Sequence, residues 1–360
     1  MLFYYFISFL FVFFCSVVFT YLIRKIALRY KIVDQPLDEG RKIHKKPIPL
    51  LGGLAIFLSF FLALFLLKEA IPQKEILLKH LVAIFIAGFF LMIGGALDDK
   101  YNLSPQKQII WPILAALIVV FSDIKINYIN NPLGQGFIYF DKVKWRIFSF
   151  GDIAFYFTPW ADFLTFVWLM GMIYTTKFLD GLDGLVAGIT AIGALIIFFL
   201  SLCLLYQPQT AFLALLLSGT LLGFLIFNFH PAKIFLGESG STFCGFILGT
   251  LAIVSGSKVA TALLIIGIPV LDAFWTILRR IFKEHRFPWL ADRKHLHFRL
   301  LDIGLSHRQA VLILYLFSFL FGLTSLFFRT TGKVVTLGIL IGIMLIFVLI
   351  LTKKSKDIKI

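Results

Sequence analysis

The sequence predicts an all-α polytopic integral membrane protein: one domain over residues 1–360, built as a bundle of about eleven transmembrane helices. Hydrophobic residues make up 60% of the 360 positions, charged residues only 15%, and the mean hydropathy is +0.95. A soluble core of this size could not bury so much apolar surface. Most of the 34 lysines and arginines fall in a few short segments between apolar runs, as in cytoplasmic loops. This clustering, rather than nucleic-acid binding, accounts for the net charge of +15.

Apolar runs of about 20 residues, the length that crosses a bilayer as a helix, define the elements in chain order. They span 2–23, 49–67, 80–97, 109–122, 158–176, 184–205, 209–228, 240–256, 258–278, 309–328 and 334–351. The first run has neither a basic start nor a small-residue cleavage site, so we expect a retained helix rather than a signal peptide. The lysine and arginine bias places the N-terminus outside and the C-terminus, with its basic tail 353–360, inside. The longest outside segment, 123–157, alternates around 137–145 and is expected to form an extracytoplasmic hairpin.

The stretch 176–185 places two carboxylates and a lysine between two strongly apolar runs. Asp180 and Asp183 are three residues apart, so they lie on the same side of a helical turn or tight loop. The glycine after each lets backbone come close to a ligand. Ionisable groups at the edge of a bilayer are costly, which indicates a candidate functional site. Taken alone, a polar turn between two membrane helices explains the stretch equally well.

Further acidic groups fall on the same predicted side of the membrane. Asp98 and Asp99 close the third apolar run, where adjacent carboxylates can bind a divalent cation or act as a general base. A solvated helix end would show the same pair. The segment 235–241 is a glycine and serine loop, and its backbone N–H groups could hold a phosphate at a helix N-terminus with Glu238 beside it.

Two basic segments on that side favour an anionic ligand. His295, His297 and Arg299 are closely spaced, a pattern that suits a diphosphate better than a tetrahedral metal site. A second segment, with Arg41, Lys42 and His44, precedes prolines at the start of the second run. Either segment could instead be a positive-inside anchor. Acids for a cation and bases for phosphates next to lipid suggest phosphoryl transfer from a water-soluble diphosphate to a membrane-resident acceptor.

Five ordered motifs between about residues 34 and 310 resemble a known family. The matching residues are Asp34-x-Pro36 with Arg41-Lys42-x-His44-x-x-Pro47-x-Pro49-x-x-Gly52-Gly53; Asp98-Asp99 with Leu103-Ser-Pro105-x-Lys107; Asp180-Gly-Leu-Asp183-Gly-Leu; Phe227-Asn228-x-x-Pro231-Ala-Lys233 with Gly237-x-Ser239-Gly-Ser241; and Asp292-Arg293-x-His295-x-His297-x-Arg299-Leu. The pattern resembles the polyprenyl-phosphate N-acetylhexosamine-1-phosphate transferases of glycosyl transferase family 4, relatives of phospho-MurNAc-pentapeptide translocase. Within that family it looks most like the branch that uses UDP-GlcNAc.

The resemblance implies a reaction on catalytic loops at the cytoplasmic face of a bacterial inner membrane. A UDP-N-acetylhexosamine, with N-acetylglucosamine the expected sugar, would donate sugar-1-phosphate to undecaprenyl phosphate and release UMP, with Mg²⁺ or Mn²⁺. This would be the first membrane step of cell-envelope polysaccharide synthesis. A homodimer is plausible by resemblance only.

The resemblance also implies roles for single residues. Asp98 would be the base that acts on the lipid phosphate, supported by Asp99, and Asp180 and Asp183 would line the nucleotide-sugar site. Expected metal ligands are Glu238, Asp98 and Asp99. Expected substrate-binding residues are Lys107, Lys177, Asn228, Lys233, His295, His297, Arg299, Arg41, Lys42 and His44.

Two departures from the family pattern concern the metal. Glu238 stands where the family usually has Asp, and Lys177 stands where it usually has Asn. Because a charged ammonium cannot ligate a metal, we expect Lys177 to pair with Glu238 and partly to replace the metal's charge, which would weaken metal dependence. Alternatively, Asp98, Asp99 or Asp180 supplies the missing ligand, or the chain is a catalytically altered homologue or a scaffold in glycan assembly.

A membrane transporter is the rival from a different class. Its charged residues would lie mid-helix near the bilayer centre, on helices related by an inverted repeat. Here the charges fall at the predicted cytoplasmic ends of the runs and no repeat is visible. The position of the charges therefore favours the enzyme.

Overall fold

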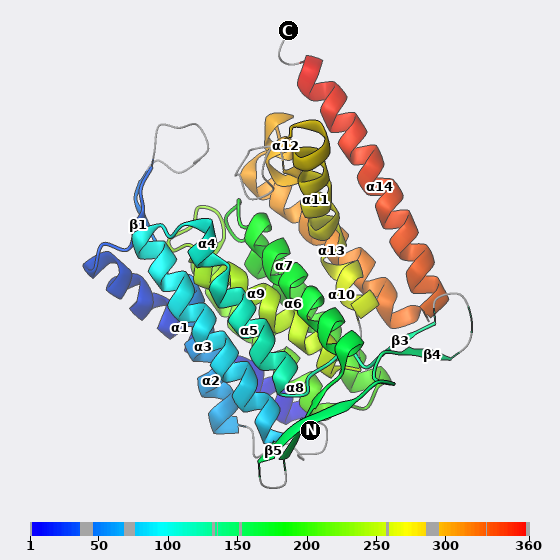
Figure 1. The fold of residues 1–360 in the computed structure, drawn as a ribbon. Coiled ribbons are helices and arrows are strands. Elements are labelled where there is room, and N and C mark those ends of the chain that lie inside the picture. Colours follow the sequence, from blue (N-terminus) through cyan, green and yellow to red (C-terminus); the bar gives the residue numbers. More distant parts are fainter. Residues whose placement is uncertain are drawn as a thin grey trace.

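The computed structural model describes residues 2–36, 46–67, 76–131, 134, 136–150, 153–256, 259–285, 295–328 and 330–357 (Figure 1). Its long helices are α1 Leu2–Arg29, α2 Gly52–Leu67, α3 Leu78–Tyr101, α5 Ile110–Phe121, α6 Pro159–Leu179, α7 Leu185–Phe199, α8 Pro208–Asn228, α9 Gly237–Val254, α13 His307–Phe327 and α14 Thr330–Asp357. The shorter helices are α4 Pro105–Gln108, α10 Val259–Ile265, α11 Gly267–Leu278 and α12 Leu296–Asp302. A π-helical turn, Leu200–Leu204, extends α7. The predicted helical class is confirmed for these residues.

Six helices of the described chain are long and apolar enough to cross a membrane: Leu2–Arg29, Leu78–Tyr101, Leu185–Leu204, Pro208–Asn228, Gly237–Val254 and His307–Phe327. The bent pair formed by α10 and α11 is either a broken span, which would be a seventh, or a re-entrant loop. Because α2, α5 and the apolar part of α14 are shorter, the polytopic class is supported but the count of about eleven spans is not confirmed.

The run at 258–278 is not the single straight helix that its apolar pattern predicts. It is broken at Ile266 into α10 and α11, whose axes differ by 82°. Pro269 supplies the physical reason, because in a continuous helix its ring would clash with the carbonyl of Ile265 and its missing N–H would leave that carbonyl unpaired. Proline is tolerated in the first turn of a new helix, and there it stands in α11.

Helix α9 forms the centre of the bundle. In its apolar window 89% of the residues are buried, against 28% for α1, so α1 is peripheral and α9 is enclosed. Glycines allow this enclosure. A Cβ on Gly95 of α3 would overlap the backbone of Ser239 in α9, so only glycine lets the two helices approach this closely. That crossing brings the end of α3 beside the start of α9.

Three two-stranded antiparallel hairpins complete the fold. They pair β1 Val33–Asp34 with β2 Ile48–Pro49, β3 Tyr128–Asn130 with β4 Phe137–Tyr139, and β5 Trp145–Phe150 with β6 Ile153–Phe157. The segment 123–157 thus contains two hairpins, and the stretch 137–145 supplies β4 and the first residue of β5 rather than a hairpin of its own. In Figure 1, β1, α4 and α12 lie at one end of the bundle, here named the site end, and β5 and the N-terminus lie at the opposite end.

Candidate active site

Asp98 lies in the last turn of α3 at the site end, held by the turn that ends the helix. Asn102 adopts a left-handed conformation (φ 48°) and donates its backbone N–H to the carbonyl of Asp98, which ends the helix. The chain then turns back, so that Leu103 N and Gln108 Nε2 each donate to Asp98 Oδ1 at 2.8 Å. Because both bonds reach one oxygen, the carboxylate has a fixed orientation.

Asp99 does not share the hydrogen-bond partners of Asp98 but positions the start of α9. Its Oδ1 accepts the backbone N–H of Glu238 at 2.8 Å, a favourable place for a carboxylate because the first N–H groups of a helix have no partner within the helix. Gly237 makes room: its φ is +71° and an added Cβ would overlap Asp99 Oδ2. That Oδ2 atom is buried and has no hydrogen-bond partner among the described residues.

The predicted ion pair between Lys177 and Glu238 is present. Lys177 Nζ, at the end of α6, lies 2.6 Å from Glu238 Oε1 at the start of α9, and both side chains are about four-fifths buried, with 20% and 18% exposed. The same ammonium donates to Gln108 Oε1 at 2.8 Å. Gln108 in turn reaches Asp98, so hydrogen bonds run without a break from Glu238 to the predicted base.

Gln108 was not among the residues predicted from the sequence. A neutral glutamine on a four-residue helix gives no chemical signal, whereas its neighbour Lys107 is cationic. In the structure Lys107 is exposed, and Gln108 is partly buried. Its Nε2 also donates to the carbonyl of Leu103 at 2.9 Å, so both ends of the amide are engaged. Only folding shows that α4 presents this side chain to the acids.

A small cleft between α3, α5 and α9 leads to Asp98 and Glu238. It is lined by Leu91, Gly94, Gly95, Asp98, Gln108, Trp111, Pro112, Glu238 and Thr242. The acids and the glutamine are the strongly polar members, and the rest of the lining is mostly apolar. Helices α3, α5 and α9 provide these mostly apolar walls.

Asp180 and Asp183 belong to the loop between α6 and α7. Asp180 is exposed to solvent, yet the protein packed around its carboxylate, followed by the charges of Glu238 and Asp183, raises its pKa to about 8. Asn228 fixes this loop against the segment after α8. Its amide oxygen accepts from Gly184 N at 3.1 Å, and its amide nitrogen donates to Ile234 O at 3.0 Å. Both ends of the predicted substrate-binding Asn228 are thus used by backbone.

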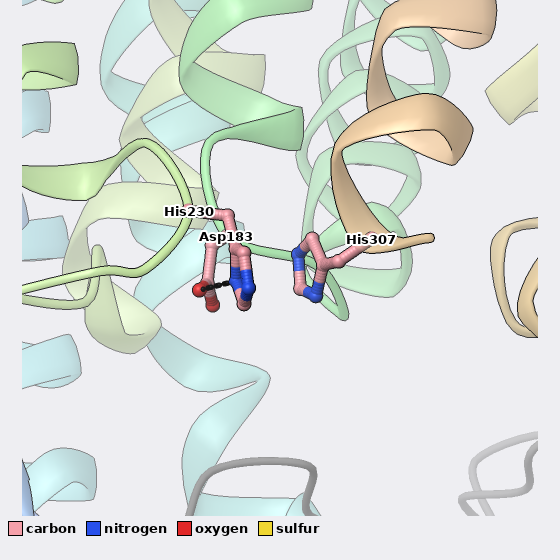
Figure 2. Close-up of side chains that lie close together, drawn as sticks. All are labelled: Asp183, His230 and His307. Atoms are coloured by element: carbon pink, nitrogen blue, oxygen red, sulfur yellow. Dashed lines mark hydrogen bonds and ion pairs between the residues drawn. The ribbon is translucent and has the colours of Figure 1, made fainter. Parts of the chain in front are cut away.

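Figure 2 shows Asp183 with His230 and His307, two histidines that were not among the predicted site residues. His230 Nδ1 lies 2.7 Å from Asp183 Oδ2, and the ring of His307 stacks on that of His230 at 4.1 Å with planes 15° apart. Ligand atoms of all three lie within 4.8 Å of one another. However, nearly parallel rings direct their in-plane lone pairs side by side rather than at one metal about 2.0 Å from each nitrogen. The arrangement is a hydrogen-bonded pair covered by a stacked ring.

The histidines of α12 are buried, not displayed at the surface. His295 is 6% and His297 1% exposed. His295 Nδ1 donates to Asp272 Oδ2 at 2.9 Å, and Leu296 N donates to Asp272 Oδ1 at 2.9 Å. Burial lowers the pKa of His297 to about 3, so it carries no charge at neutral pH. Its Nε2 is buried without a described partner, packed against Gly181.

The structure brings most of the predicted site residues to the site end. Among the predicted cations, Lys107 and Lys233 are exposed and Arg299 is partly buried. Arg41, Lys42 and His44 lie outside the described residues. Asp272 was missed because it stands inside an apolar run with no neighbouring motif. It lies on α11, and its carboxylate contacts His295 and Leu296 at the start of α12.

The acids near Lys177 do not form a divalent-cation site as they are arranged. A metal site needs several His, Cys, Asp or Glu ligand atoms close together. In the described parts of the chain, three such atoms lie within 4.8 Å of one another at Asp183, His230 and His307, and not around Glu238. Lys177 Nζ already occupies the space next to Glu238 Oε1 at 2.6 Å. A Mg²⁺ bound to that oxygen at about 2.1 Å would lie no more than about 4.7 Å from the ammonium. Their repulsion would be about 7 kcal/mol at an effective dielectric constant of about 20.

Comparison with known proteins agrees with this geometry. A sequence model of glycosyl transferase family 4 matches residues 81–256. Over 339 residues the chain is 31% identical to a probable undecaprenyl-phosphate N-acetylglucosaminyl 1-phosphate transferase of Bacillus subtilis, an alignment that covers 92% of this chain and 85% of the relative. It is 32% identical over 368 residues to a decaprenyl-phosphate N-acetylglucosaminephosphotransferase of Mycolicibacterium smegmatis, covering 93% and 86%.

A third relative, an undecaprenyl-phosphate alpha-N-acetylglucosaminyl 1-phosphate transferase of Yersinia pestis, is 28% identical over 320 residues, covering 85% of this chain and 79% of its own length. The matched range, 81–256, contains Asp98, Lys177, Asp180 and Glu238. Near-complete coverage at this identity shows common descent of the whole helical domain and not of one motif. The chain therefore belongs to glycosyl transferase family 4, the family of these polyprenyl-phosphate transferases.

Proposed function

We propose that this protein transfers N-acetylglucosamine-1-phosphate from UDP-N-acetylglucosamine to undecaprenyl phosphate and releases UMP. The observation that carries the proposal is the place of Asp98, a fixed carboxylate at the polar part of a cleft with otherwise mostly apolar walls. A lipid-borne phosphate and a water-soluble donor could meet there. The names of the three relatives supply the polyprenyl phosphate and the N-acetylglucosaminyl phosphate.

The proposed step is a displacement at the β-phosphorus of the donor. An oxygen of the lipid phosphate forms a new P–O bond there, and the P–O bond to the α-phosphate breaks, so that its electron pair leaves on UMP. Asp98 accepts the proton of the lipid phosphate and later returns it to water. Since both hydrogen bonds to Asp98 from the described residues reach Oδ1, its Oδ2 serves as the base.

The remaining residues bind and orient in this proposal. The loop with Asp180 and Asp183 holds the nucleotide sugar, and Lys233 and Arg299 contribute charge for the two phosphates. His297, neutral and buried, shapes the site through packing instead of charge. The protein acts in a bacterial inner membrane with its site end in the cytoplasm. The eleven-span count and a homodimer stay predictions.

The test is UMP release by purified protein in detergent with UDP-N-acetylglucosamine and undecaprenyl phosphate. Asp98→Asn should lower the rate by about a hundredfold or more, because general base catalysis contributes factors of that size. Asp141→Asn makes the same change between β4 and β5, at the opposite end of the molecule, and should leave the rate unchanged. Equal rates for wild type and Asp98→Asn would exclude this base, and absence of UMP with every N-acetylhexosamine donor would exclude the function.

A further inference from the structure

We propose that the ammonium of Lys177 replaces a catalytic divalent cation at this site, and that Gln108 couples it to Asp98. The inference rests on the proposed function for its activity test but has its own binding test. Lys177 Nζ is 2.6 Å from Glu238 Oε1 and 2.8 Å from Gln108 Oε1. The cation is therefore a side chain of this protein, held between an anionic and a neutral acceptor.

Lys177 has one donor left for a substrate. An ammonium carries three N–H donors and no acceptor, and the described residues supply acceptors for two of them, on Glu238 and Gln108. The side chain is 20% exposed, and the ring of Tyr174 lies near the same nitrogen, with its centroid 5.7 Å from Nζ. Charge-assisted N–H bonds to phosphate oxygens are short and strong. A diphosphate oxygen entering between α6 and α9 would complete the coordination of the nitrogen.

The same contact fixes the direction of the Gln108 amide. Because Lys177 can only donate, it must face the amide oxygen, which turns the NH₂ group toward Asp98 Oδ1. The NH₂ group then holds Asp98 Oδ1 in one orientation at 2.8 Å. The relay Glu238–Lys177–Gln108–Asp98 thus gives two functions to one cation: charge for the donor phosphates and a fixed orientation of the base for the acceptor.

The side chains of Lys177 and Glu238, the two residues that depart from the family pattern, are together long enough to bring their charged groups within 2.6 Å. Glu238 projects from the first turn of α9, and its backbone N–H is already held by Asp99. Lys177 comes from the last turn of α6. The extra methylene of a glutamate, compared with an aspartate, is what lets the carboxylate close the gap to the ammonium. Glu238→Asp should open this ion pair, and Lys177→Asn should remove the cation and leave two amides beside the acids.

The binding test is a Mn²⁺ titration of EDTA-stripped protein, read from the electron paramagnetic resonance signal of free Mn²⁺. Lys177→Asn should bind Mn²⁺ at least about tenfold more tightly than wild type, because the repulsive charge is gone. Asp183, His230 and His307 are the same in both proteins, so Mn²⁺ bound there would contribute equally to both titrations and would not change the difference in affinity. Equal Mn²⁺ affinity in the two proteins would overturn the proposal.

The activity test is UMP release in EDTA and in Mg²⁺. Wild type should keep its rate in EDTA within about twofold, whereas Lys177→Asn should lose at least about tenfold in EDTA and recover with Mg²⁺. Lys177→Arg keeps the charge and should remain resistant to EDTA, so it answers the question if Lys177→Asn fails to fold. Loss of wild-type activity in EDTA, restored by Mg²⁺, would overturn the proposal. If no protein releases UMP, the proposed function fails while the Mn²⁺ titration still decides the replacement.

Discussion

The carboxylate of Asp99 and the backbone N–H of Glu238 are joined by a 2.8 Å hydrogen bond, so the last turn of α3 caps the first turn of α9. The paired acids Asp98 and Asp99 therefore have different roles despite being adjacent in sequence. Asp98 is oriented by the loop that follows it and by Gln108. Asp99 holds the helix that carries Glu238, and thereby fixes where the ion pair with Lys177 forms.

Removing this cap should destabilise the protein. Asp99→Ala should lower the free energy of unfolding by about 1–2 kcal/mol, the usual cost of losing a helix N-cap. Asp99→Asn retains an oxygen that can accept the Glu238 N–H and should cost less. Thermal unfolding in detergent measures both. An asparagine variant as unstable as the alanine variant would mean that the charge of Asp99, and not its hydrogen bond, is what matters.

Gly237 should tolerate no side chain. Gly237→Ala adds a Cβ at φ +71° that would also overlap Asp99 Oδ2, so it should destabilise the protein and abolish UMP release. Gly256→Ala is the matched control, because Gly256 also has positive φ (+84°) but its nearest neighbours are 3.7 Å or more away. The control should cost only the backbone strain, about 1–2 kcal/mol. Equal loss of thermal stability in the two variants would show that the contact with Asp99 adds nothing.

Asp272 should be required for activity through His295. Asp272→Asn weakens acceptance of the His295 Nδ1 proton, so the ring loses its fixed tautomer, and we expect the rate of UMP release to fall by about tenfold or more. The helix should remain folded, since an asparagine oxygen can still accept Leu296 N. Thr276→Val removes the hydroxyl 3.5 Å from the same nitrogen and should have little effect, because that contact is at the limit of a hydrogen bond. A rate profile against pH that is the same for wild type and Asp272→Asn would exclude a role through His295.

Acid should destabilise the protein through His297. Its folded pKa, about 3, lies below the ordinary value of 6.5, so between these pH values the unfolded chain binds a proton that the folded chain does not. Stability is therefore complete above about pH 6.5 and falls by up to about 1.4 kcal/mol per pH unit below it.

Comparing unfolding midpoints at pH 7.5 and 5.5 checks this. His297→Gln should reduce the difference between the two midpoints. His285→Gln, a change at an exposed residue, should leave the difference as it is in wild type. A pH dependence untouched by His297→Gln would assign acid sensitivity to other groups.

Several parts of the site could be predicted from local sequence. They depend on the hydropathy of a run or on the attraction between opposite charges, which do not require the fold to be known. Long apolar runs become helices in a membrane protein whatever their neighbours. Lys177 and Glu238 are opposite charges standing at two positions of one motif set, so their attraction predicted the ion pair that the structure contains. The acids of α3 were recognisable because paired carboxylates at the end of an apolar run are costly without a function.

Other parts depend on which segments meet, and that is decided by packing. Gln108, Asp272 and His307 have no signal in their own neighbourhoods, since a neutral amide, an acid inside an apolar run and a single histidine each have common structural explanations. His230 stands in the polar segment after the seventh apolar run, but nothing there indicates His307 as its partner. Asp272 lies 24 residues before its partner Leu296, and only the packing of α12 against α11 brings the two together. The two histidines come together only because the loop after α8 meets the start of α13.

The sequence by itself determined the class of the protein, the approximate position of its helices, the acids and bases of the site and the substitution of Lys177 for a neutral residue. Tertiary structure alone decided which of them touch: that Asp99 caps α9, that Gln108 joins Lys177 to Asp98, and that His297 is buried and neutral. The physical reason is the distance along the chain over which each property is determined. Hydropathy and charge are properties of single positions, whereas hydrogen bonds and burial depend on ångström-scale contacts between helices far apart in the chain.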